Sequence, residues 1–359
     1  MKTKNTATCF AILAAALYAV NIPLSKLLLA HVGSAMMAAL LYLGAGLGLV
    51  LYSGIRRAAG KPTVQEPLTK KELPGTVAMV VLDIAAPILL MLGIARTNSA
   101  NVSLLNNFEI VATTLLAAAF FHEVVSKRLL AAIVLVTLAS VLLGFESSDG
   151  FTFNTGSLFV LGACVCWGLE NNCTRTISSK SSVEIVMIKG CCSGAGSLVI
   201  AFLAGERLPE LKWILCVLLL GFVAYGLSIN FYIKAQKELG AAKTSAFYSV
   251  APFLGVGFSL LLLGERPAPQ FYAAFAVMLA ATVLLVRDTV TLQHTHEHAH
   301  THTHEHRHGS LVHTHEHTHL HSHIHTHGNR EDLHGHTHSD LAGHNHSHAL
   351  DVDSNQTMP

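Results

Sequence analysis

One carboxylate stands in the middle of a long apolar stretch of this sequence. Glu109 follows Asn106 and Asn107 in a run that is otherwise rich in alanine, leucine and phenylalanine. A charge inside a membrane-spanning helix is costly, so such a residue is by default a candidate for function. Glu109 is predicted to bind a proton or to pair with a cationic substrate. The alternative is a structural ion pair with Lys26 or Lys189.

Further polar residues interrupt neighbouring apolar runs. Asp83 stands four residues before Pro87, whose missing N–H frees a backbone carbonyl. Glu170 and Asn171 close their own run, where a gate, a helix cap and a substrate contact all fit. Lys189 falls inside a run, from which its long side chain could also reach the membrane surface. The predicted substrate or ion pathway comprises Glu109, Asp83, Asn106, Asn107, Glu170, Asn171, Lys189 and Lys26.

The end of the chain is rich in histidine. Of 24 histidines, 22 follow residue 290, many at every second position. Neutral imidazole is a ligand for zinc, nickel and cobalt, so this tail is predicted to bind such ions, although the protein is expected to require no cofactor. Polar low-complexity sequence cannot build a core, so the tail is predicted to be disordered. The predicted metal ligands are His294, His296, His298, His300, His302, His304, His306, His308, His313, His315, His317, His319, His321, His323, His325 and His327.

The composition places most of the chain in lipid. Hydrophobic residues make up 51% and charged residues 13%, about half the charged share of a soluble domain. The apolar residues form runs of about twenty, the length that crosses a bilayer as a helix. The net charge of +1 argues against a nucleic-acid-binding protein. No nucleophile–base set or phosphate loop is recognisable, so an enzyme is not expected.

The apolar runs predict an all-α membrane protein with ten transmembrane helices. Short breaks between runs make successive helices antiparallel neighbours. The predicted helices are Cys9–Leu29, Gly33–Gly54, Gly75–Ala95, Ala100–Phe121, Leu129–Phe145, Gly156–Cys173, Val183–Leu203, Trp213–Ile233, Thr244–Leu263 and Gln270–Val286. Basic residues concentrate in alternate breaks, which places both termini in the cytoplasm.

The second half of the sequence repeats the first. A shift of 142 residues lays Leu104–Leu143 over Ala246–Leu285, with identical Val-Leu-Leu triplets near the ends. Each repeat contains five helices, an odd number, so the second repeat is predicted to be inverted. The expected units are residues 1–147, residues 148–288 and the tail, 289–359. Inverted repeats are typical of alternating-access transporters; the alternative is that duplication merely builds a stable bundle.

These features resemble the EamA-type drug/metabolite transporter family over nearly all of residues 7–287. The resemblance rests on the paired five-helix units, on Glu123 and Glu265 after the fourth and ninth helices, and on Tyr18-Ala19 and Trp167-Gly168. Further stretches, such as Ser103 to Glu109 and Cys166 to Asn172, resemble a bacterial and archaeal subgroup that can carry a histidine-rich tail. The resemblance implies a multi-pass protein of the cell (inner) membrane that exports a small metabolite or drug, driven by an ion gradient or by exchange.

The sequence therefore predicts a proton-coupled exporter of a small organic solute, with the lipid bilayer and the solute as partners. Two alternatives remain open at this level. One is an exporter of zinc, nickel or cobalt that collects its cargo on the tail, with a path built from carboxylates and cysteines such as Cys166 and Cys173. The other is a metal or pH sensor that transports nothing. The sequence also leaves open a homodimer.

Overall fold

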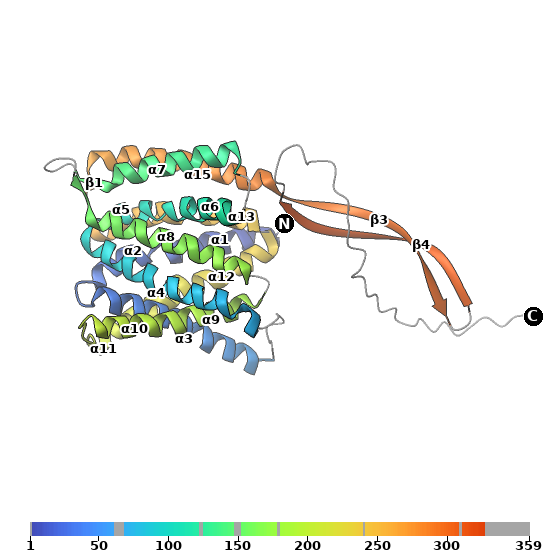
Figure 1. The fold of residues 1–359 in the computed structure, drawn as a ribbon, viewed down its shortest axis with the longest axis horizontal. Helices are drawn as coiled ribbons and strands as arrows, with labels where there is room; N and C mark the ends of the chain where they lie inside the picture. Colours follow the sequence, from blue (N-terminus) through green and yellow to red (C-terminus); the bar gives the residue numbers. More distant parts are fainter. Residues whose placement is uncertain are drawn as a thin grey trace, which may run out of the picture.

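The computed structural model describes residues 2–60, 68–121, 125–146, 152–177, 180–239, 241–308 and 311–326. Its main body is a bundle of roughly antiparallel helices, from one end of which a long two-stranded ribbon projects (Figure 1). The N-terminal end of the chain and the start of the ribbon lie at this same end of the bundle (Figure 1). Glu123 and His327 lie outside the described residues.

The five predicted helices of the first half are all present, and two of them are interrupted. The first is divided at Val20 and the fourth at Asn106–Asn107, while a short 3-10 turn precedes the third. The helices are α1 (Lys2–Ala19), α2 (Asn21–Leu28), α3 (Ser34–Ala58), η1 (Lys70–Glu72), α4 (Leu73–Arg96), α5 (Ser99–Leu105), α6 (Phe108–Phe121) and α7 (Lys127–Gly144). Two short antiparallel strands, β1 (Phe145–Glu146) and β2 (Thr152–Phe153), lead into the second half.

The second half also contains its five predicted helices, three of them modified. Two pass through a π-helical segment, and a third is divided at Ser249–Val250. The elements are α8 (Thr155–Thr176), α9 (Ser182–Ile188), η2 (Lys189–Ser193), α10 (Gly194–Leu203), α11 (Leu211–Gly221), η3 (Phe222–Leu227), α12 (Ser228–Leu239), α13 (Ala241–Tyr248), α14 (Ala251–Leu263) and α15 (Pro269–Leu292).

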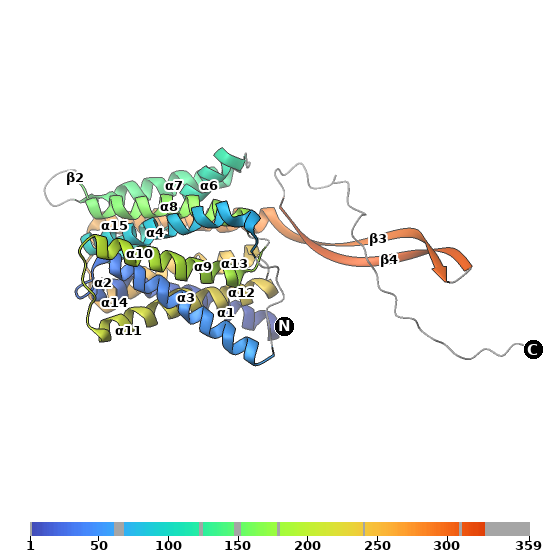
Figure 2. The ribbon, with the colours of Figure 1, turned by 60° about the horizontal axis from the view of Figure 1, so that its bottom comes forward.

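The bundle has the dimensions and the surface of a membrane protein. Within the described residues, nine helical stretches are long and apolar enough to cross a bilayer. The tenth predicted crossing, α8, is 22 residues long but ends in the polar sequence Glu170 to Asn172, which lowers its hydropathy. It lies against α4 and α6 within the bundle (Figures 1 and 2). Large apolar side chains cover the outside, such as Leu203 at 80% and Leu261 at 82% exposure, as expected for a lipid-facing surface.

Close packing around α3 depends on glycine. An added Cβ at Gly190 would lie 2.4 Å from the Cα of Gly46, and one at Gly44 would lie 2.2 Å from the backbone oxygen of Leu218. Small residues let membrane helices approach closely, because lipid offers no hydrophobic drive to press them together. Through these contacts α3, from the first half, holds both η2 and α11 of the second half.

The tail is described in part. Strands β3 (Gln293–His308) and β4 (Leu311–Thr326) pair antiparallel, and their register places histidine opposite histidine, from His294 with His325 to His306 with His313. The disorder that the composition predicts for residues 289–359 stays a prediction. Alternation of histidine with other residues has the period of a strand, which explains how one register matches them throughout.

Candidate functional site

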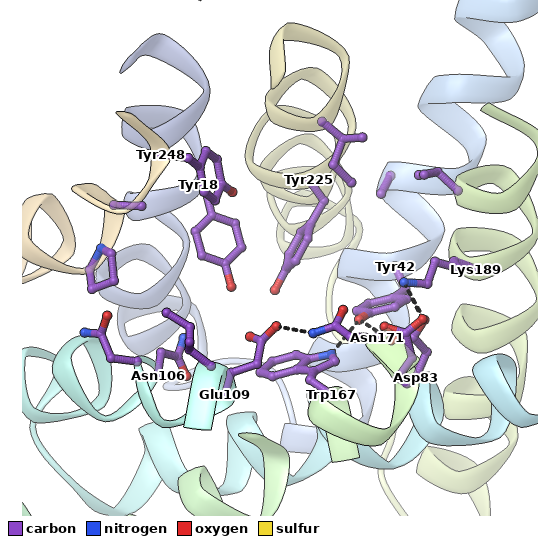
Figure 3. Close-up of a pocket in the computed structure, with 18 of the residues that line it drawn as sticks. Tyr18, Tyr42, Asp83, Asn106, Glu109, Trp167, Asn171, Lys189, Tyr225 and Tyr248 are labelled. Atoms are coloured by element: carbon purple, nitrogen blue, oxygen red, sulfur yellow. Dashed lines mark hydrogen bonds and ion pairs between the residues drawn. The ribbon is translucent and has the colours of Figure 1, made fainter. Parts of the chain in front are cut away.

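A cavity of about 430 Å³ lies inside the bundle, at the junction of the two halves (Figure 3). Helices from both halves contribute to its wall. It is lined by Tyr18, Tyr42, Ala45, Asp83, Asn106, Asn107, Glu109, Ile110, Trp167, Glu170, Asn171, Val186, Lys189, Gly190, Tyr225, Ile229, Tyr248, Ser249, Ala251 and Pro252. Seven of the eight predicted pathway residues are therefore brought together in one place.

Irregular helix segments shape this cavity. The breaks at Asn107 and at Ser249 are 142 residues apart, so they occupy equivalent positions in the two repeats, and both line the cavity. The two π-helical segments supply Lys189 and Tyr225 to the same wall. Breaks and π segments are common at functional sites, since they free backbone groups and turn side chains away from the regular helix face.

Glu109 stands in the first turn of α6 and is half-buried. One oxygen of its carboxyl group accepts a hydrogen bond of 2.8 Å from Asn171 Nδ2, which also contacts Thr113 Oγ1 at 3.2 Å. The carboxyl group projects toward the hydroxyl ends of Tyr18 and Tyr225 (Figure 3). Glu109 thus presents a carboxyl group to the cavity and is positioned by an amide of α8.

Lys189 forms a buried ion cluster with two other carboxylates. Its Nζ lies 2.8 Å from Glu170 Oε1 and 3.4 Å from Asp83 Oδ2, and both acidic side chains are almost fully buried. The Tyr42 hydroxyl donates to Asp83 Oδ1 at 3.2 Å, and the Thr174 hydroxyl donates to Glu170. Lys189 therefore points inward rather than toward the membrane surface. Its ion-pair partners are Asp83 and Glu170 rather than Glu109.

Lys26 is the predicted pathway residue that the structure places elsewhere. It does not belong to the cavity lining. Its ammonium group donates to the backbone oxygens of Ile94 and Thr97, the latter at 2.8 Å, at the C-terminal end of α4. The carbonyl groups at a helix C-terminus lack intrahelical partners and attract cations, so Lys26 caps α4. Lys26 binds backbone carbonyl groups and Lys189 binds Asp83 and Glu170, so neither lysine forms the structural ion pair with Glu109 that was the alternative prediction.

Five aromatic side chains line the cavity, and none of them is among the predicted pathway residues. The ring centroids of Tyr18 and Tyr225 are 5.8 Å apart, those of Tyr18 and Tyr248 are 5.9 Å apart, and those of Tyr42 and Tyr225 are 5.7 Å apart. Trp167 Nε1 donates to the Tyr42 hydroxyl at 3.4 Å. The sequence does contain a signal for them. Tyrosine and tryptophan gather at membrane interfaces, so their positions within apolar runs could have indicated that they line a site.

The cysteines form no part of the cavity wall. All seven are free thiols, and Cys166 and Cys173 are absent from the lining. Within the described residues, no three histidine, cysteine, aspartate or glutamate side chains are grouped as a metal site. The metal path through carboxylates and cysteines therefore has no counterpart in the described part of the bundle.

Comparison with known proteins agrees with this architecture. The chain is 26% identical over 212 residues to an uncharacterized transporter of Methanothermobacter thermautotrophicus, an alignment that covers 56% of this chain and 61% of that relative. A solved crystal structure of another protein matches with a TM-score of 0.57 and 18% identity, over 80% of this chain and 98% of the other, which shows a shared fold. The profile of the EamA-like transporter family matches residues 5–145 and again residues 154–287, so the chain is a multi-pass membrane protein that belongs to the EamA-like transporter family.

Proposed function

We propose that this protein exports a small organic solute across the cell membrane in exchange for protons, with Glu109 as the proton-binding group. The observation that carries the proposal is the Glu109 carboxyl group, which faces an internal cavity between two repeats. Alternating access needs such a site near the repeat interface, and coupling needs a group there that can hold either a proton or the solute.

The lining favours an organic solute over a metal ion. Five aromatic rings and three amide side chains are among the residues of the wall, and none of the described lining residues is a histidine or a cysteine, the ligands that a transition-metal path calls for. Export, rather than uptake, rests on the resemblance to the family.

The test uses purified protein in sealed liposomes that contain a pH-sensitive dye. Amino acids, organic cations, neutral solutes and divalent metals are added in turn. We expect an organic solute to drive proton movement in the parent protein and not in Glu109→Gln. Glu210→Gln is the matched control, because the Glu210 side chain is 70% exposed, pairs with Lys212 and does not line the cavity. Proton movement with zinc, nickel or cobalt alone would contradict the proposal.

We also propose that both termini lie in the cytoplasm of a bacterial or archaeal cell. Basic residues support this orientation: Arg56 and Arg57 lie in the last turn of α3, and Lys70 and Lys71 lie in η1 before α4. A fluorescent protein fused after residue 359 should fluoresce, whereas alkaline phosphatase fused there should be inactive. The reverse result would contradict the orientation.

We propose that the tail binds zinc, nickel or cobalt and that this binding is not needed for solute transport. The observation in support is the register of β3 and β4, which places histidines in seven directly opposed pairs. Directly opposed residues are the closest cross-strand neighbours, and imidazole is a ligand for these ions. Deletion of residues 290–359 should abolish zinc binding measured by calorimetry and leave solute transport unchanged. Unchanged zinc binding would contradict this assignment.

A further inference from the structure

The charges of the cavity are unbalanced. Asp83, Glu109 and Glu170 contribute three carboxyl groups, and Lys189 is the one cationic side chain among the described residues of the lining. Lys189 already contacts two of these carboxyl groups. A solute that carries an anionic group would therefore meet no free cation in the wall and would approach buried negative charge, which is unfavourable at low dielectric.

The aromatic rings form a continuous wall opposite Glu109. Tyr248, Tyr18, Tyr225 and Tyr42 follow one another at centroid distances of 5.9, 5.8 and 5.7 Å. They come from α13, α1, η3 and α3, so tertiary packing gathers them around one space. A phenol oxygen accepts a hydrogen bond from an ammonium group, and a tyrosine ring attracts a cation that lies within about 6 Å of its centroid over the ring face.

Hydrogen bonds fix the directions of the Tyr225 hydroxyl group and the Glu109 carboxyl group. Asn21 Nδ2 donates to the Tyr225 hydroxyl at 3.0 Å, and Asn171 holds one oxygen of Glu109. Figure 3 shows the Tyr18 and Tyr225 hydroxyl groups directed toward the Glu109 carboxyl group. An ammonium group placed in this space would lie between the Glu109 carboxyl group and the hydroxyl ends of two tyrosines, while an apolar remainder could pack on Trp167 and Ile110.

We propose that the transported solute is an organic amine or ammonium ion with an apolar portion and no carboxylate. This inference rests on the proposed function and narrows it to one substrate class. An α-amino acid is disfavoured, because its carboxylate would need the ammonium group that Asp83 and Glu170 already occupy.

Binding can be followed by tryptophan fluorescence in the full chain. The protein has two tryptophans, and Trp213→Phe leaves Trp167, in the cavity wall, as the sole tryptophan. Phenylalanine keeps an aromatic ring stacked on His31, whose ring centroid is 3.9 Å from that of Trp213. The protein is titrated in lipid nanodiscs with phenethylamine, L-phenylalanine and 2-phenylethanol, which share a ring and differ in charge.

We expect saturable quenching by phenethylamine and at least tenfold weaker binding of the other two compounds. The three compounds are compared on one protein, Trp213→Phe, so a difference between their affinities does not arise from a difference in folding. Glu109→Gln should weaken phenethylamine binding at least tenfold and leave the weak binding of 2-phenylethanol unchanged. Tyr225→Leu should weaken the amine about fivefold or more, and Tyr225→Phe, which keeps the ring, should weaken it less. Equal or tighter binding of L-phenylalanine, or an amine affinity that Glu109→Gln does not change, would overturn the inference.

The liposome assay separates failure of this inference from failure of the proposed function. If a neutral or zwitterionic solute drives Glu109-dependent proton movement and amines do not, the transporter proposal stands and the amine inference is wrong. If no solute of any charge drives proton movement, the proposed function itself is wrong.

Discussion

The Nζ of Lys189 lies 2.8 Å from Oε1 of Glu170, which joins the π-helical segment η2 to α8 beside the cavity. Asp83, from α4, completes the cluster, so one ammonium group links three helices of the bundle. Charged groups in a membrane interior are stable only when they are paired. The cluster therefore fixes one wall of the cavity, and the positive charge of Lys189 is neutralised by Asp83 and Glu170.

Replacement of this lysine should destabilise the bundle strongly. Lys189→Met leaves Asp83 and Glu170 buried without a counter-ion, and breaking a buried pair costs about 3 kcal/mol or more. The thermal unfolding midpoint in detergent should fall. The triple variant Lys189→Met, Asp83→Asn and Glu170→Gln removes the unpaired charge and should recover most of the loss. A triple variant no more stable than Lys189→Met would show that charge pairing is not the cause.

The close approach of η2 to α3 should tolerate no side chain. Gly190→Ala would place a Cβ 2.4 Å from the Gly46 Cα, a backbone contact that can be relieved only by moving a helix. We expect a loss of about 1–3 kcal/mol in unfolding free energy, since the extra methyl group overpacks the contact between η2 and α3. Gly54→Ala is the control, with no atom within 4 Å, and should be neutral or slightly stabilising. Equal effects of the two substitutions would contradict the packing argument.

Glu265 should hold the start of α5. Its carboxylate accepts hydrogen bonds from the backbone N–H groups of Ser99 at 2.8 Å and Ala100 at 2.9 Å. A carboxylate at a helix N-terminus satisfies unpaired donors and interacts favourably with the helix dipole. Glu265→Gln should cost about 1 kcal/mol and speed hydrogen exchange of these two amides, measured by mass spectrometry. Glu210→Gln should leave their exchange unchanged; unaltered protection in Glu265→Gln would refute the capping role.

Lys26 should matter for stability and not for solute affinity. Its ammonium group caps carbonyl groups of Ile94 and Thr97, so Lys26→Met is expected to lower unfolding free energy by about 1 kcal/mol. Titration of Trp167 fluorescence with phenethylamine should give the parent affinity. A loss of affinity as large as that of Glu109→Gln would place Lys26 in the binding site and contradict the structure.

The sequence alone determined the helical bundle, because a run of about twenty apolar residues in lipid has helix as its available structure. All ten predicted segments are helical in the described residues, and nine qualify as spans by length and hydropathy. The repeat and the family were also readable, since the shift of 142 residues aligns whole segments. Glu109 was identifiable because a carboxylate among apolar residues stands out by composition.

Only the tertiary structure decided which side chains share the cavity. Tyr18, Tyr42, Trp167, Tyr225 and Tyr248 come from five different elements, and each alone looks like another apolar residue of a membrane helix. The π segments were equally hidden, since an extra residue in a helical turn leaves hydropathy unchanged and only rotates the face that follows it. The partners of Lys189, which lies in a π segment, depended on that rotation, and those of Lys26 depended on the packing of α2 against α4. Sequence therefore placed the charges along the chain, and packing alone determined whether each became a cap, an ion pair or a binding group.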